Sequence, residues 1–175
     1  YYWDGLTFLP VSLDSETELT YPVRDVAYKT TPPTGYWMIS GPGLYQGTEI
    51  SLTAVATAPS SSDFFVGLYW NGVDTFYLAQ GGIDGRVFTS SDGSAWSTLN
   101  SSLDINHDVA DFAGYNNGSV DIVLLGGGTD KDKNVSGYYE RINGGSFGTP
   151  SSSYSAGSDY SDLSLSENPV RRFFV

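Results

Sequence analysis

Oxygen-bearing side chains recur at alternate positions in one short segment, a spacing suited to binding a metal ion. Asp130, Asp132 and Asn134 alternate with two lysines. Carboxylate and amide oxygens at this spacing begin many calcium-binding loops. The segment departs from the usual loop, because Val135 stands where a turn glycine is normal. The sequence therefore predicts either a Ca²⁺ site, with no other cofactor expected, or a solvated, charged loop tip.

A second acidic group surrounds the one histidine of the chain. Asp104, His107 and Asp108 could ligate a metal or hold an acid–base pair, but a transition metal usually needs more imidazole or thiolate ligands. The alternative is a loop histidine that caps a turn. With Asp84 and Asp130, the two aspartates could also supply the carboxylate pair of a glycoside hydrolase, about 5–10 Å apart.

Aromatic side chains offer a further contact for a ligand. They recur in adjacent pairs at Tyr1-Tyr2, Tyr36-Trp37, Tyr69-Trp70, Tyr138-Tyr139 and Phe173-Phe174. Neighbours on a strand face opposite sides, so one member of each pair is expected to pack in the core. Trp70 borders the turn Asn71-Gly72 and is expected to be exposed enough to stack on a sugar ring.

The composition excludes several classes of function. Eight Lys and Arg stand against 20 Asp and Glu in 175 residues, and the net charge of −12 repels nucleic acids and anionic membranes. There is no cysteine, so a disulfide scaffold and a thiolate site are excluded. No apolar run approaches the roughly 18 residues needed for membrane insertion. Few lysines and Ser-, Asn- and Gly-rich loops indicate a secreted, periplasmic or cell-surface protein.

The elements that would position these residues repeat along the chain. A short apolar segment recurs at 36–41, 76–81, 122–127 and 172–175. An apolar strand and a turn precede each copy, and further strands follow each complete copy. Successive copies lie about 40–50 residues apart, which is the length of a four-stranded propeller blade.

We therefore predict an all-β fold, a β-propeller of about four blade equivalents in a single domain over residues 1–175. Its parts are a half-blade at 1–14, blades at about 22–58, 63–100 and 108–150, and a half-blade at 161–175. The half-blades would complete one blade, within one chain or by exchange in a homodimer, because this removes exposed sheet edges. The alternatives are a β-sandwich and one part of a larger propeller.

One segment carries a recognisable motif. The residues Ser90-Ser91-Asp92-Gly93-Ser94-Ala95-Trp96 resemble the Asp-box of sialidase-type (BNR-repeat) propellers, one residue shorter than the commonest spacing. The resemblance implies a structural turn between the third and fourth strands of a blade, formed by Ser90, Asp92, Gly93 and Trp96. In such a turn the aspartate accepts backbone amides, the glycine takes an unusual φ, and the tryptophan packs between blades. None of the five arginines sits in the motif that begins the sialidase pattern, so the resemblance concerns fold alone.

In a propeller, the connections between second and third strands lie on the same face as the connections between blades. The predicted repeat places most of the acidic residues on this face. This face receives Asp63, Asp84, Asp104, His107 and Asp108. We predict a non-enzymatic binding or scaffold module that recognises glycan or protein through this acidic face. The alternatives are a glycoside hydrolase that uses paired carboxylates there, and an assembly part of a larger propeller with no site of its own.

Overall fold

The computed structural model describes residues 19–48, 51–59, 63–105, 111–128 and 137–147, together with three two-residue strands that precede them. This part of the chain is all-β, as predicted, and it contains no helix. It follows that no helix in the described part could cross a membrane. Short aromatic and β-branched runs, broken by glycine and asparagine, explain why strands and tight turns form here.

The main strands form three antiparallel meanders, each built from strands that are consecutive in the chain. The first meander contains β4 (Val23–Lys29), β5 (Gly35–Ser40), β6 (Gly43–Gly47) and β7 (Ser51–Ala54). The second contains β8 (Phe65–Trp70), β9 (Phe76–Gln80), β10 (Gly82–Ser90) and β11 (Ser97–Ile105). The third contains β12 (Asp111–Asn116), β13 (Asp121–Gly128) and β14 (Gly137–Ile142).

Three short strands precede these meanders in the chain. β1 (Tyr2–Trp3) and β2 (Phe8–Leu9) pair with one another, and β3 (Ser12–Leu13) adds to β7 in parallel. One residue pair, Ile105 with Gly128, joins the second and third meanders into a single sheet. No sheet in the described residues closes on itself. Residues 161–175 lie outside the described residues, so the predicted pairing of the two half-blades stays a prediction.

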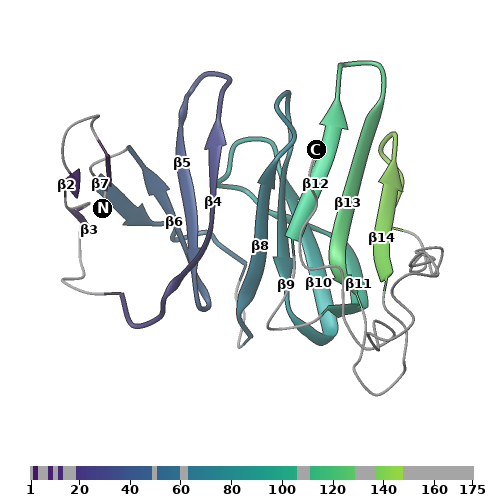
Figure 1. Cartoon of the computed structure of the whole chain (residues 1–175), viewed down its shortest axis with the longest axis horizontal. Helices are drawn as coiled ribbons and strands as arrows, with labels where there is room; N and C mark the ends of the chain where they lie inside the picture. The colour runs from purple at the N-terminus through teal and green to yellow at the C-terminus, as the bar shows by residue number, and fades with distance from the viewer. Residues whose placement is uncertain are drawn as a thin grey trace, which may run out of the picture.

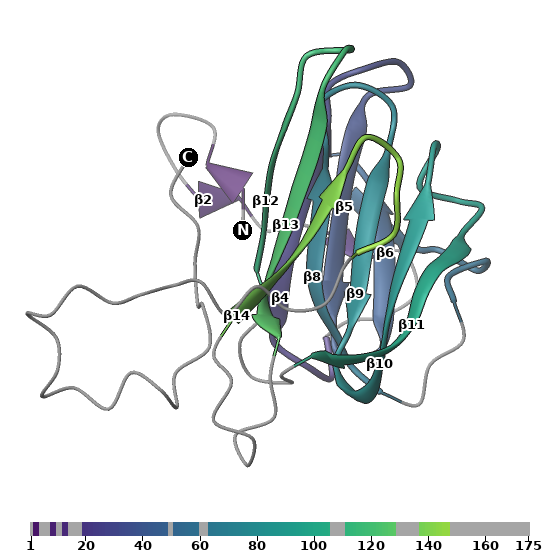
Figure 2. The same ribbon diagram turned by 90° about the vertical axis from the view of Figure 1, so that its right-hand side faces the viewer.

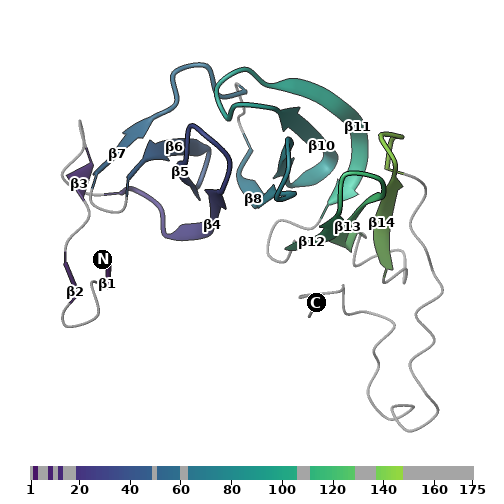
Figure 3. The ribbon, with the colours of Figure 1, turned by 90° about the horizontal axis from the view of Figure 1, so that it is seen from above.

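The three meanders lie side by side along an arc, and all their strands except β6 and β7 run roughly upright in Figure 1. Seen from above, β4, β8 and β12 line the concave side of the arc, and β7 and β11 lie on its convex side (Figure 3). β8 packs against both β4 and β12. In Figure 2 the third meander stands in front of the other two, which shows the same stacking from the side.

Two apolar clusters fill the gaps between neighbouring meanders. The first lies between the first two meanders and comprises Ala27, Trp37, Ile39, Leu44, Val55, Phe65, Leu68, Trp70, Phe76, Leu78 and Phe88. The second lies between the second and third and comprises Val66, Tyr77, Ala79, Val87, Leu103, Ile105, Phe112, Val123, Leu125, Tyr139 and Phe147. Adjacent residues of β9, Phe76 and Tyr77, enter opposite clusters because strand side chains alternate. Burial on both faces explains why β9 is apolar up to its last residue, Gln80.

Asparagine and glycine occupy the tight turns. After β14, Asn143 and Gly144 have φ of +47° and +81°, and the Gly145 N–H donates to the Ile142 carbonyl oxygen at 3.1 Å. Gly72 has φ of +85°. Beside it, the Asn71 side-chain oxygen accepts the backbone N–H groups of residues 73–75, each at 3.0 Å. The short polar side chain thus holds the turn without help from distant residues.

Two predicted connections are strand instead. Asp84 lies within β10 and Asp104 within β11, so the prediction that connecting loops carry them is wrong. The β10–β11 ladder continues to Gly82 opposite Ile105 through register shifts on both sides of Gly85. A Cβ on Gly85 would stand 2.7 Å from the Leu103 carbonyl oxygen, so only glycine permits this close approach.

Candidate functional site

The turn at 90–96 is held by its own side chains. The Ser90 hydroxyl oxygen accepts the backbone N–H of Gly93 at 2.9 Å. Asp92 Oδ1 accepts the N–H groups of Ser94 and Ala95 at 2.7 and 2.9 Å. Gly93 takes φ of +80°. All of these bonds lie within seven residues, so local sequence is enough to form the turn.

The same turn fastens the second meander to the first. The Gly93 carbonyl oxygen accepts two indole N–H groups, from Trp96 at 3.1 Å and from Trp37 of β5 at 3.3 Å. A Cβ on Gly93 would stand 2.2 Å from the Trp37 indole nitrogen. Trp96 packs against the first apolar cluster, with its ring 6.2 Å from that of Phe76. The segment therefore has a structural role, and no ligand is needed to explain it.

Replacing Asp92 with asparagine is expected to lower the free energy of unfolding by about 1 kcal/mol at pH 7, because a charged acceptor of two backbone amides becomes neutral. These amides hold the pKa of Asp92 below its ordinary value of 3.8. The ionised side chain thus stabilises the fold above pH 3.8, and this contribution is lost as pH falls through the lowered pKa. Urea denaturation from pH 7 down to pH 2.5 measures the difference, which should shrink with acidity. If the difference in unfolding free energy between wild type and D92N stays constant with pH, Asp92 does not stabilise the turn through its charge. The control is D84N, which neutralises an exposed aspartate of β10 outside this turn.

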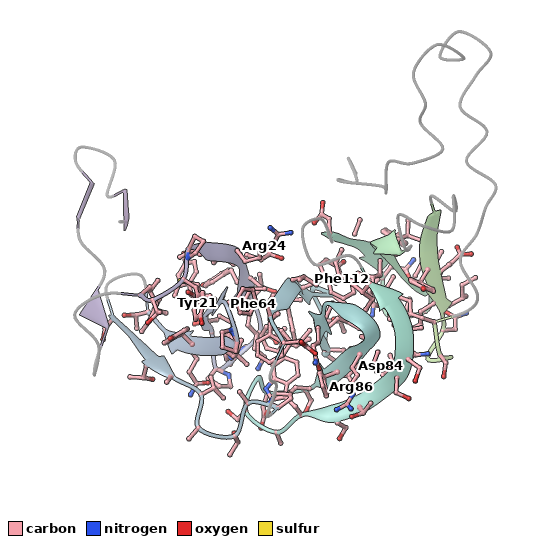
Figure 4. The ribbon with its side chains drawn as sticks, turned by 90° about the horizontal axis from the view of Figure 1, so that it is seen from below. Tyr21, Arg24, Phe64, Asp84, Arg86 and Phe112 are labelled. Carbon is pink, nitrogen blue, oxygen red and sulfur yellow. The ribbon has the colours of Figure 1, made fainter. Side chains whose placement is uncertain are left out.

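The arc has two ends, which we call the connection end and the hairpin end. The connection end carries residues 41–42, 63–64 and 81–84. The hairpin end lies opposite and carries residues 71–75, 91–96, 117–120 and 143–145. Asp84 is exposed at the connection end, near Arg86 on the same strand (Figure 4). Asp104 lies opposite in β11, and its side chain is outside the described set. His107, Asp108, Asp130, Asp132 and Asn134 also lie outside the described residues.

Trp70 is not the exposed sugar platform that the sequence suggested. Its side chain is 7 % exposed, and its ring lies 4.7 Å from that of Phe76 in the first apolar cluster. Its indole N–H donates to the Thr30 hydroxyl at 3.3 Å, and the Lys29 ammonium sits 5.4 Å from its ring. The expectation of exposure is wrong because the first meander covers this end of β8, a contact between residues 40 positions apart.

An exposed aromatic pair occupies the middle of the connection end and was missed in the sequence. The rings of Tyr21 and Phe64 meet edge to face at 4.8 Å, and the side chains are 37 % and 43 % exposed. Figure 4 shows them side by side, with Arg24 reaching out on the concave side of the arc. Tyr21 packs on Gly41, where any Cβ would stand 2.4 Å from its ring. The only sequence signal was a large aromatic residue just before the first strand of each of two meanders.

Backbone bonds set the position of Phe64, and the Tyr21 carbonyl oxygen accepts the Ser40 hydroxyl at 2.6 Å. The Gly41 carbonyl oxygen accepts the Phe65 N–H at 2.9 Å, and the Phe64 carbonyl oxygen accepts the Gly81 N–H at 3.0 Å. The segment that connects the first two meanders is thereby held between Gly41, in a turn of the first meander, and Gly81, in a turn of the second. Nearby, the Gln80 amide donates to Asp63 at 3.2 Å, whereas its buried carbonyl oxygen has no hydrogen-bond partner among the described residues.

A half-buried carboxylate bridges the two inner strands β4 and β8. Asp25 accepts the N–H of Val26 and that of Leu68, both at 2.8 Å. Burial raises the pKa of Asp25, and the negative charge of Asp111 raises it further. Because both oxygens of Asp25 receive backbone donors from the protein itself, the residue has a structural explanation.

The described residues contain no group of three or more His, Cys, Asp or Glu side chains arranged to hold a metal ion. The predicted calcium segment is outside them, so the Ca²⁺ prediction stays open. Of the four carboxylates considered for glycoside hydrolysis, only the Asp84 side chain is described, and it is exposed. Comparisons with protein-family models, with curated proteins and with solved structures find no match to this chain.

Proposed function

We propose that the chain is a non-enzymatic binding module with propeller architecture, and that its connection end recognises a protein partner. The architecture is supported by three meanders of consecutive antiparallel strands, each with its first strand on the concave side (Figure 3). An apolar cluster between each pair of neighbours and the Asp-box-like turn are further support. On this proposal the protein belongs with the Asp-box propellers, at a cell surface or in a secreted or periplasmic space.

The outer faces of the two end meanders support ring closure. Val26 and Tyr28 of β4 are 51 % and 45 % exposed, and Tyr115 and Ile142 of the third meander are 56 % and 52 % exposed. Exposed apolar sheet faces of this kind are usually covered. A last blade made from residues 1–14 and 161–175 would cover both, either within one chain or by exchange between two chains.

The observation that carries the binding proposal is the exposed Tyr21–Phe64 pair. Tyrosine and arginine are enriched among the residues that dominate protein–protein binding energy, and Arg24 and Arg86 lie at the same end (Figure 4). Backbone bonds hold Phe64, and a bond from the Ser40 hydroxyl holds the backbone of Tyr21, so little entropy is lost when a partner packs on the pair. With a net charge of −12, a basic partner is favoured electrostatically.

Selection from a random peptide display library on the immobilised chain tests this proposal. We expect enriched basic peptides that contain apolar anchors, and the double variant Y21A/F64A should bind them about 30-fold more weakly, because an aromatic anchor contributes about 2 kcal/mol. Biolayer interferometry measures the affinities. The control V73A shortens an exposed apolar side chain at the hairpin end and should bind like the wild type.

Two results would overturn the proposal. The first is that no peptide is enriched above background, or that enriched peptides bind Y21A/F64A as tightly as the wild type. The second is a glycan array on which the wild type binds and Y21A/F64A does not, because the connection end would then recognise glycan.

A further inference from the structure

A polar pocket lies at the hairpin end, away from the site proposed above. It has a volume of about 350 Å³ and lies between the β8–β9 hairpin, the β12–β13 hairpin and the turn that follows β14. Figure 3 looks onto this end of the molecule. The size is at the lower end of the range of about 300–1,000 Å³ for small-molecule sites, so one ring-sized ligand fits.

Arg141 is the most buried charged residue of this pocket. Its side chain is 10 % exposed, and one terminal nitrogen, Nη1, donates to Asp121 Oδ2 at 2.6 Å and to the Tyr77 hydroxyl at 2.7 Å. The guanidinium also lies 5.3 Å from the Tyr77 ring. Burial raises the pKa of Tyr77, which keeps that hydroxyl neutral and able to donate to Asp121 at 3.3 Å. Three strands, β9, β13 and β14, therefore hold the arginine rigidly.

The arginine keeps donor capacity that the protein does not use. Its Nε is buried and has no hydrogen-bond partner among the described residues. Its other terminal nitrogen, Nη2, lies beside the Gly144 turn that lines the pocket, 3.8 Å from where a Cβ of that glycine would stand. A buried donor without an acceptor is costly, so such groups in native proteins usually have an explanation such as a ligand.

The charges around the pocket favour a neutral ligand. The positive charge of Arg141 is already matched by Asp121, and Asp74 adds a further carboxylate to the lining. An anion would meet this excess of negative charge. The side-chain amides of Asn116 and Asn143 line the same space. Their oxygens already accept backbone N–H groups at 2.8 and 2.9 Å, but each oxygen has a second lone pair and each amide nitrogen a further N–H.

Apolar and hydroxyl groups complete the lining. Val73 and Val120, on hairpins of the second and third meanders, are 39 % and 37 % exposed and give the pocket two apolar contacts. Thr75 and Ser119 add hydroxyl groups. A pyranose ring has the matching chemistry, because its hydroxyls both donate and accept hydrogen bonds and its C–H groups are apolar.

From these features we infer that the pocket between the second and third meanders binds one neutral sugar ring, with the guanidinium of Arg141 donating to its hydroxyls. The ring could come from a free monosaccharide or from the end of a glycan chain. This inference is independent of the protein-binding site at the connection end, because the two sites share no residue.

Calorimetric titration of the full chain with glucose, galactose, mannose, fucose and N-acetylglucosamine, together with a glycan array, tests the inference. We expect one of these sugars to bind with a Kd of about 1 mM as a monosaccharide, a value set by its few atoms. If the chain binds glycans on the array but no free monosaccharide in the titration, the pocket recognises the ends of glycan chains. The acidic probes glucuronic acid and sialic acid should bind at least 10-fold more weakly.

Two variants locate the binding. S119W places a large ring at an exposed position of the pocket lining and should abolish binding, whereas the control S91W places the same ring on an exposed turn outside the pocket. R141K keeps the charge but removes the Nε and Nη2 donors, and should weaken binding at least 10-fold.

Several outcomes would overturn the inference. The first is that no neutral sugar binds in either assay, with sugar concentrations up to 20-fold above the expected Kd in the titration. The second is that the chain binds the acidic probes more tightly than the neutral sugars. The third is that S119W binds the sugar as the wild type does. Because Y21A/F64A leaves this pocket intact, sugar binding by that variant should equal the wild type, so the two proposals fail separately.

Discussion

Replacing Phe76 with alanine is expected to lower the free energy of unfolding by about 3–5 kcal/mol, the usual cost of removing a buried phenylalanine. The side chain is fully buried in the first apolar cluster. Its ring lies 4.7 Å from those of Trp37 and Trp70, and 6.2 Å from that of Trp96. These tryptophans come from two meanders and the turn that fastens them, so the cavity would loosen the contact between the meanders.

Urea denaturation followed by tryptophan fluorescence measures this change directly, because three of the four tryptophans contact the substituted ring. The control V73A shortens a side chain that is 39 % exposed on the β8–β9 hairpin, and it should change the free energy of unfolding by less than about 0.5 kcal/mol. A loss of less than about 1 kcal/mol in F76A would mean that the gap between the first two meanders is not packed as described.

The second large effect is expected for Gly93 in the turn at 90–96. Gly93→Ala should lower the free energy of unfolding by about 3 kcal/mol. A residue with a Cβ is strained at φ of +80° by about 1 kcal/mol, and displacement of the Trp37 indole, 2.2 Å away, adds lost hydrogen bonds and packing.

Gly72→Ala is the matched control for this substitution. Gly72 has φ of +85°, but nothing lies within 4 Å of the position of its Cβ. Its substitution should therefore cost only the backbone strain of about 1 kcal/mol. Thermal denaturation of both variants separates strain from steric contact. Equal losses in G93A and G72A would show that the Gly93–Trp37 contact contributes nothing to stability.

Local features of the fold were predictable where the interactions that form them are close in sequence. The Asp-box-like turn uses bonds among Ser90, Asp92 and the next three residues. The hairpin at Asn71 is held by the side chain of that residue. Opposite burial of Phe76 and Tyr77 follows from strand geometry alone.

The candidate sites were less predictable, because their residues come from different meanders. Tyr21 and Phe64 are 43 positions apart and meet only because a strand connection is clamped between two turns. Arg141, Asp121 and Tyr77 come from three strands in two meanders, and sequence reasoning connected none of them. Their proximity depends on register and on the packing of β9 against the third meander.

The sequence by itself determined the all-β class, the positions of the tight turns, the alternation of aromatic pairs and the seven-residue motif turn. Each rests on contacts within a few residues, which any tertiary arrangement preserves. Only the tertiary structure decided that Trp70 is buried, that β10 and β11 extend through Asp84 and Asp104, and which side chains meet at the two ends of the arc. These depend on which strand lies beside which, and that choice is made by long-range packing between whole meanders.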